Sequence, residues 1–128
     1  MAMRPAEQKS KKSAPRINDC GLIPFQQALE LQHELRQKRR ANEIPDTVLL
    51  CEHRPVITLG AREPANRLRI EADELAARNI EQARTRRGGG ATAHNPGQLV
   101  FYPILDLRAR GLGAADYIRR LESVGIEL

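Results

Sequence analysis

Apolar residues recur at helical spacing in one long segment near the start of the chain. Within residues 25–40 (FQQALELQHELRQKRR) the apolar side chains are Phe25, Ala28, Leu29, Leu31 and Leu35. This spacing follows the helical period, and the last turn is basic, which opposes the negative end of a helix dipole. The pattern therefore predicts a helix over residues 25–40.

Short apolar runs between turn residues predict strands. Pro45 ends the helical pattern, and residues 47–51 (TVLLC) form a β-rich run that we expect to be buried. A second run, residues 56–60 (VITLG), ends at a glycine, and the pair suggests neighbouring strands. Residues 99–107 (LVFYPILDL) predict a further strand, in which Pro103 implies a sheet edge or a bulge.

Two more helical segments complete the pattern. Residues 71–78 (EADELAAR) predict a short helix ended by Asn79, and residues 114–123 predict another. Between them, residues 80–85 lead as an extended segment into three glycines. Strands interleaved with helices indicate an α+β or α/β domain, and 128 residues are enough for one core. Because only 3% of residues are aromatic, that core must be aliphatic.

Charge divides the chain into a tail and a domain. The formal net charge is +5, and basic residues cluster in residues 1–16, which we interpret as a disordered tail before a domain over residues 17–128. A basic balance favours acidic partners. The basic start lacks a following apolar segment, and no stretch is long enough to span a bilayer, so we expect a cytoplasmic protein with no membrane partner.

The two cysteines, Cys20 and Cys51, lie far apart without a CxxC pair or zinc-ligand spacing. Reduced thiols are therefore expected, and no metal or cofactor site is predicted. Cys51 falls in a predicted strand, where burial in apolar surroundings would raise its pKa and lower its reactivity.

One segment, residues 86–98 (RRGGGATAHNPGQ), has a composition that a simple connection does not explain. Consecutive glycines weaken helices and strands, permit positive φ and leave backbone N–H groups able to face a carbonyl, carboxylate or phosphate. Arg87 could add a charge-assisted contact. The GK[ST] of a Walker loop and the distant acidic residue of a dinucleotide motif are both missing. These residues alone leave a ligand loop and a structural glycine turn as equal alternatives.

The ordered motifs around this loop resemble those of the lipoyl(octanoyl) transferases. That family usually shows an arginine, two glycines, a variable pair and then Thr-Tyr-His-Gly-Pro-Gly-Gln-Leu, and residues 87–99 match most of it. Residues 44–60 look like the family's EIPDTLLLLEHPPVYTLG, and residues 102–107 and 116–117 continue the likeness. The similarity covers residues 20–123 and corresponds to about the first half of a family member.

The resemblance implies a fold and an activity. The fold is the mixed-sheet α+β catalytic domain shared with lipoate and biotin protein ligases, here incomplete. The activity is transfer of an octanoyl group from acyl carrier protein to a lysine of lipoyl-bearing domains, in lipoate biosynthesis. The implied partners are octanoyl-acyl carrier protein, the lipoyl domains of oxoacid dehydrogenase complexes and the glycine cleavage H protein, with no cofactor.

The resemblance also assigns site residues. Its substrate-binding residues are Arg87, Gly88, Gly89, Gly90, Ala91, Thr92, Ala93 and His94. The family's nucleophilic Cys and its paired Lys lie in the later half, so no catalytic residue is assigned in this chain and its activity alone is expected to be impaired or absent.

Two positions depart from the family's loop. Ala93 stands where Tyr is usual, which removes a ring and a hydroxyl from the acyl pocket. Asn95 stands where Gly is usual, a change we expect to be tolerated because Asn adopts the left-handed region more readily than most residues. His94 could hydrogen-bond a substrate carbonyl or hold the loop, and for His53 we expect a structural role.

Two alternatives remain open. The chain could be an inactive fragment or an acyl-binding remnant, as the absent Cys and Lys suggest. It could be an ATP-dependent lipoate or biotin protein ligase, since residues 88–91 look ligase-like, whereas residues 52–60 and 96–98 favour the transferase. Nucleic-acid binding is not expected, because basic residues are not interleaved with aromatic ones.

Overall fold

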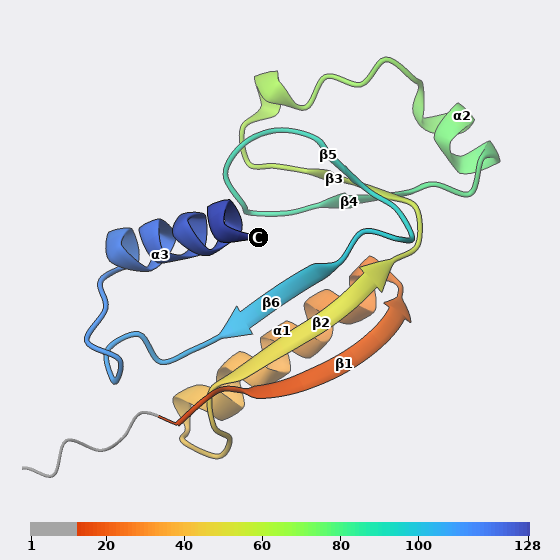
Figure 1. The fold of residues 1–128 in the computed structure, drawn as a ribbon. Coiled ribbons are helices and arrows are strands. Elements are labelled where there is room, and N and C mark those ends of the chain that lie inside the picture. Colours follow the sequence, from red (N-terminus) through yellow and green to blue (C-terminus); the bar gives the residue numbers. More distant parts are fainter. Residues whose placement is uncertain (1–12) are drawn as a thin grey trace, which may run out of the picture.

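The computed structural model describes residues 13–128, which form two three-stranded mixed sheets and three α-helices (Figure 1). Mixed sheets with separate helices are the predicted α+β class, which is confirmed. In chain order the elements are β1 (Arg16–Ile23), α1 (Phe25–Arg40), β2 (Thr47–His53), β3 (Val56–Leu59), the short 3-10 helix η1 (Glu63–Ala65), α2 (Ala72–Ala77), β4 (Glu81–Arg84), β5 (Thr92–His94), β6 (Val100–Ile104) and α3 (Ala114–Glu127).

The first sheet has β2 at its centre, parallel to β1 and antiparallel to β6. Alternate residues of β2 are fully buried, as expected for a strand with one face against a core. Helix α1 covers that sheet (Figure 1), and the buried cluster is built from Leu35 of α1, Leu49 of β2 and Ile104 of β6. This cluster is aliphatic, as the composition predicted, but the prediction of a wholly aliphatic core was wrong, because the ring of Phe25 is also buried.

The second sheet has β3 at its centre, parallel to β4 and antiparallel to β5. The prediction that β2 and β3 are neighbouring strands was wrong. Each is the central strand of its own sheet, with both edges already paired, so neither has a free edge to offer the other. The turn at Arg54 and Pro55 carries the chain from one sheet into the other.

Most predicted elements are present. Helix α1 has the predicted ends, Asn79 follows α2 at a positive φ of 55°, and β6, which contains Pro103, is an edge strand. Helix α3 continues beyond the predicted residue 123 to Glu127. Within residues 13–128 no helix has both the length and the apolar character that crossing a bilayer requires.

The tail prediction needs a correction at one residue. Arg16, the last residue of the predicted tail, is the first residue of β1, and its N–H donates to the Asp46 carbonyl at 2.8 Å. Pairing with β2 gives the end of that segment an ordered backbone that its charge did not suggest. The part of the prediction that concerns residues 1–12 lies outside the described residues.

Candidate functional site

The glycine-rich loop joins β4 to β5, and both strands flank β3, so the end of β3 holds the start of the loop. The N–H and the Oγ1 of Thr85 both donate to the Leu59 carbonyl at 2.9 Å. The N–H of Ala61 donates to the Arg87 carbonyl, also at 2.9 Å. The loop is thus presented at a strand end, as predicted.

The side chain of Arg87 turns back onto the protein's own strand. Its Nη2 donates to the Thr58 carbonyl at 2.8 Å and to Thr58 Oγ1 at 2.6 Å, and its Nη1 donates to the Gly88 carbonyl at 3.1 Å. Thr58 is 1% exposed, so this guanidinium reaches into the second sheet. Arg87 anchors the loop, and the charge-assisted contact expected for a ligand is made here to the fold.

Two glycines are required by close backbone packing. A Cβ on Gly60 would lie 2.0 Å from the Gly89 carbonyl oxygen, and a Cβ on Gly90 would lie 2.0 Å from the Ala65 carbonyl oxygen. The side chain of Asn66 holds Gly60 from both sides, donating to its carbonyl at 2.8 Å and accepting from its N–H at 2.9 Å. The loop is therefore clamped against residues 60–66.

The loop has backbone hydrogen-bond donors that the fold does not use. Among the described residues, the N–H groups of Gly88, Gly89 and Gly90 donate to no partner. A Cβ on Gly88 would meet nothing within 4 Å, and Gly89 has a φ of +81°. Packing explains Gly60 and Gly90, which supports the structural interpretation of the loop, and it leaves the successive N–H groups of residues 88–90 unused by the fold.

His53 is fully buried between the sheet and α1. Its Nδ1 lies 3.1 Å from the Ile23 carbonyl and its Nε2 lies 2.7 Å from the Tyr102 hydroxyl. Because a carbonyl oxygen only accepts, Nδ1 carries the hydrogen and Nε2 accepts from Tyr102. Both ring nitrogens are occupied within the fold, which supports the structural role expected for His53.

His94 ends β5 beside that buried pair. Its Nδ1 lies 3.0 Å from Gln98 Oε1 and therefore donates to it, which leaves Nε2 as the acceptor of the neutral ring. The ring stacks on Phe25, with centroids 6.4 Å apart, and meets His53 edge-on at 6.0 Å. His94 thus packs between the two sheets and keeps one nitrogen for a further contact.

The turn after β5 does not require the conformation expected for Asn95. Asn42 and Asn79 are the non-glycine residues with positive φ among those described, so the left-handed argument for Asn95 was wrong. Gly97, at a φ of +90°, makes that turn, and its N–H donates to Glu52 Oε2 at 2.8 Å. This bond ties the turn to β2, a contact that sequence patterns did not suggest.

Both thiols have raised pKa values, which lowers the fraction present as the nucleophilic thiolate. Burial, with smaller contributions from Cys20 and Asp19, raises the pKa of the Cys51 thiol to about 11, and Cys51 is 2% exposed. Burial, then the charge of Asp19, raises the pKa of Cys20 as well. The prediction of Cys51 as a core residue is confirmed. Within residues 13–128 no group of His, Cys, Asp and Glu side chains is arranged to hold a metal ion.

Comparison with known proteins gives a consistent family. The model of the lipoyl protein ligase A/B catalytic domain matches residues 24–128. An octanoyltransferase of Rubrobacter xylanophilus is 49% identical over 107 residues, covering 83% of this chain and 48% of the relative. One of Roseiflexus sp. is 42% identical over 106 residues, covering 83% and 44%. The chain thus spans about half the length of the relatives it matches.

A solved structure is similar at a lower level. A T. acidophilum protein with bound lipoic acid superposes with a TM-score of 0.47 at 20% identity, covering 70% of this chain and 36% of that one.

Proposed function

Because the chain belongs to the lipoyl protein ligase A/B catalytic domain family, we propose that it forms the acyl-binding part of a protein octanoyltransferase. The proposed reaction moves an octanoyl group from acyl carrier protein to a lysine of the lipoyl domains of oxoacid dehydrogenase complexes and of the glycine cleavage H protein. Relatives named octanoyltransferase, at 42% and 49% identity, support this choice.

One observation carries the proposal, namely three successive N–H groups that donate to no described partner, on a loop that the fold holds in place. The anchoring bonds of Arg87 and the packing of Gly60 hold the loop without using the N–H groups of residues 88–90. A carbonyl oxygen of the acyl thioester accepts such donors well, and a fixed loop binds it without first losing conformational freedom. The proposed substrate-binding segment is Arg87, Gly88, Gly89, Gly90, Ala91, Thr92, Ala93 and His94, in which the side chain of Arg87 anchors the loop and the residues after it face the substrate.

The chemistry divides into two acyl transfers. A thiolate attacks the carrier thioester, forming an enzyme thioester and releasing the carrier's thiolate, which takes a proton from water. The target lysine's neutral amine then attacks that thioester, forming the amide and releasing the enzyme thiolate, with the amine proton passing to a base. Cys20 and Cys51 have raised pKa values and suit neither step, so the described residues bind and orient the acyl group.

Two measurements test this proposal. The first is binding of an octanoyl amide of pantetheine, which cannot transfer its acyl group, to the purified chain. We expect saturable binding, and a chain that stays folded but does not bind it would overturn the proposal. The second is mass spectrometry of a lipoyl domain incubated with the chain and octanoyl-acyl carrier protein. Octanoylated acceptor without ATP identifies a transferase, whereas binding without transfer identifies an acyl-binding remnant.

The ATP-dependent ligase is the alternative that the same assay separates. Product formed only from octanoic acid with ATP would favour the ligase, to which residues 88–91 are similar. The proposal places the protein in the cytoplasm. The free thiols Cys20 and Cys51 support that location, because a reducing compartment keeps thiols unpaired.

A further inference from the structure

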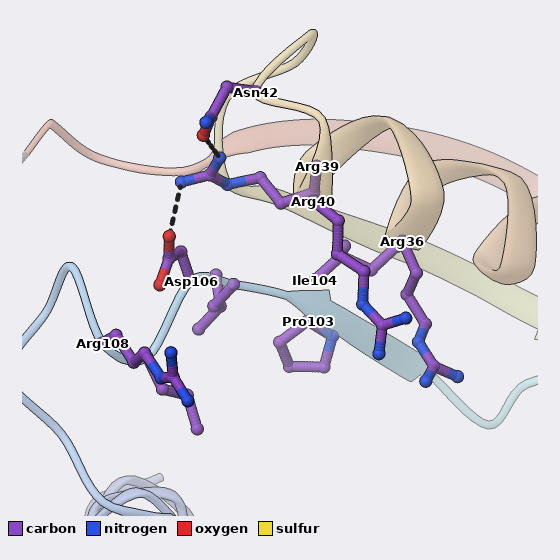
Figure 2. Close-up of a pocket in the computed structure, with 10 residues that line it drawn as sticks. Arg36, Arg39, Arg40, Asn42, Pro103, Ile104, Asp106 and Arg108 are labelled. Carbon is purple, nitrogen blue, oxygen red and sulfur yellow. Dashed lines mark hydrogen bonds and ion pairs between the residues drawn. The ribbon is translucent and has the colours of Figure 1, made fainter.

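An arginine-lined hollow lies at the C-terminal end of α1, beside the end of β6 (Figure 2). Its volume is about 640 Å³. Four arginines line it, three from α1 and one from the segment after β6, against a single aspartate. The lining arginines are Arg36, Arg39, Arg40 and Arg108, and the aspartate is Asp106.

One of these arginines is already neutralised within the fold. Arg39 donates through Nε to Asp46 at 2.6 Å, and its Nη2 lies 3.5 Å from Asp106 Oδ2. In Figure 2 its guanidinium turns toward Asn42 and Asp106. Arg39 therefore holds the wall of the hollow together, and its charge is not available to a partner.

The other three carry uncompensated charge. Arg36, Arg40 and Arg108 are exposed and form no ion pair within residues 13–128. Arg36 and Arg40 stand four residues apart, on the same face of α1, a spacing at which like charges disfavour the helix. Figure 2 shows both side chains extending in the same direction past Pro103. Stability of the fold does not account for this arrangement.

Apolar side chains also line the hollow, beside the arginines. Pro103, Ile104, Leu105 and Leu107 line the hollow, with Ile104 buried and the others partly buried. An inorganic anion would use the charges alone. A cationic rim around an apolar floor instead matches an amphipathic helix whose exposed face combines acidic and apolar residues.

We propose that this hollow docks an acidic amphipathic helix on the surface of the acyl carrier protein, an inference that rests on the proposed function. The hollow and the glycine-rich loop lie toward opposite ends of α1, because Phe25, its first residue, contacts His94. A helix of 16 residues is about 24 Å long, so the carrier's body would dock at one end of α1 while its prosthetic arm extends toward the loop at the other. Docking and acyl binding are therefore separable.

A charge-matched pair of variants tests the docking site. The triple variant Arg36→Gln, Arg40→Gln, Arg108→Gln removes the rim charges. The control Arg54→Gln, Arg69→Gln, Arg120→Gln removes equally many exposed arginines elsewhere. Binding of carrier protein without an acyl group is measured at low and at physiological salt. We expect the rim variant to bind about tenfold more weakly at low salt and the control to bind like the unmodified chain.

Several outcomes would overturn the proposal. Equal weakening of carrier binding by both variants would mean that net charge, not this hollow, attracts the carrier. If the unmodified chain does not bind the carrier at all, the carrier is not the partner. If the lipoyl domain binds at the hollow and the carrier does not, the hollow belongs to the acceptor. Amide chemical shifts of the unmodified chain give a second readout, which must change around residues 36–42 and 103–108. Binding of octanoyl-pantetheine amide tests the proposed function separately, since the rim variant must retain it.

Discussion

Alanine substitutions at Gly60 and Gly88 separate the structural role of the loop from its proposed binding role. Alanine at position 60 places a Cβ 2.0 Å from the Gly89 carbonyl oxygen, whereas alanine at position 88 meets nothing within 4 Å. Gly88 also has no positive φ that would strain a side chain. The same added methyl group is therefore expected to disturb the fold at one position and only the ligand face at the other.

The magnitudes follow from those distances. Relieving the overlap at position 60 requires the loop to move by about 1 Å, and overpacking of this kind costs about 2 kcal/mol. For a chain of this size that corresponds to a fall in Tm of roughly 8 °C. Gly88→Ala should change the free energy of unfolding by less than about 0.5 kcal/mol. Alanine keeps the backbone N–H, but its methyl group stands in the open space beside the loop and should hold the acyl carbonyl away from the N–H groups, which weakens binding of octanoyl-pantetheine amide about tenfold.

Thermal unfolding followed by circular dichroism and binding by calorimetry give the two readouts for both variants. The reasoning predicts opposite patterns, in which Gly60→Ala lowers Tm and Gly88→Ala lowers affinity at unchanged Tm. If Gly88→Ala binds the amide as tightly as the unmodified chain, the N–H groups of residues 88–90 do not hold the acyl carbonyl. If Gly60→Ala unfolds at the unmodified temperature, the loop is not clamped as described.

Three further changes test the surrounding structure. Arg87→Lys keeps the charge but cannot hydrogen-bond Thr58 and Gly88 together. The amide hydrogens of Ala61 and Ala91 should therefore exchange with solvent about thirtyfold faster, which corresponds to a loss of about 2 kcal/mol of local stability. Arg86→Lys changes an exposed neighbour and is the control, which should leave both exchange rates unchanged. Burial alone would raise the pKa of Asp46, but hydrogen bonds from Arg39, the Asp106 amide and Arg110 outweigh it and lower that pKa. The stabilisation by the Asp46 carboxylate is therefore complete above its unfolded pKa of about 4 and is lost as pH falls through the folded pKa. Asp46→Asn should lower the free energy of unfolding by about 2–3 kcal/mol, measured with urea at pH 7. A difference in unfolding free energy between the variant and the unmodified chain that does not shrink at pH 3 would contradict this. Alkylation followed by mass spectrometry should modify Cys51, whose thiol has a pKa of about 11, only after unfolding, and labelling of the folded chain at pH 8 would contradict its burial.

The periodic elements could be predicted because their signals are local. Helix α1 carries its apolar stripe and its basic last turn within residues 25–40, and both ends agree with the structure. The strand predicted over residues 47–51 runs two residues further, to His53. The prediction stopped early because the polar ring of His53 does not continue the apolar run in the sequence. In the structure that ring is buried and bonded to Tyr102, a partner that lies 49 residues away.

The missed strands depend on pairing across long separations. Strand β1 mixes polar and apolar residues without regular alternation, its side chains are largely exposed, and its order comes from pairing with β2. Strand β5 has three residues, too few for an alternating pattern, and is defined by its ladder with β3. The assignment of β2 and β3 to separate sheets has the same origin, since it depends on which strands arrive from elsewhere in the chain.

The loop could be located from its composition, but the role of Arg87 could not. Its partner Thr58 lies 29 residues away in the sequence, and nothing in the sequence around Thr58 distinguishes it from other strand residues. An arginine before glycines therefore predicts an anion contact or an anchor equally well, and only the fold distinguishes them. Anchoring is also the more useful role for an acyl-binding loop. The carbonyl of an acyl thioester carries no charge, so a guanidinium directed at it would add little to binding. A guanidinium that fixes the backbone contributes more to the proposed binding, because it holds the N–H groups of residues 88–90 in place before the ligand arrives.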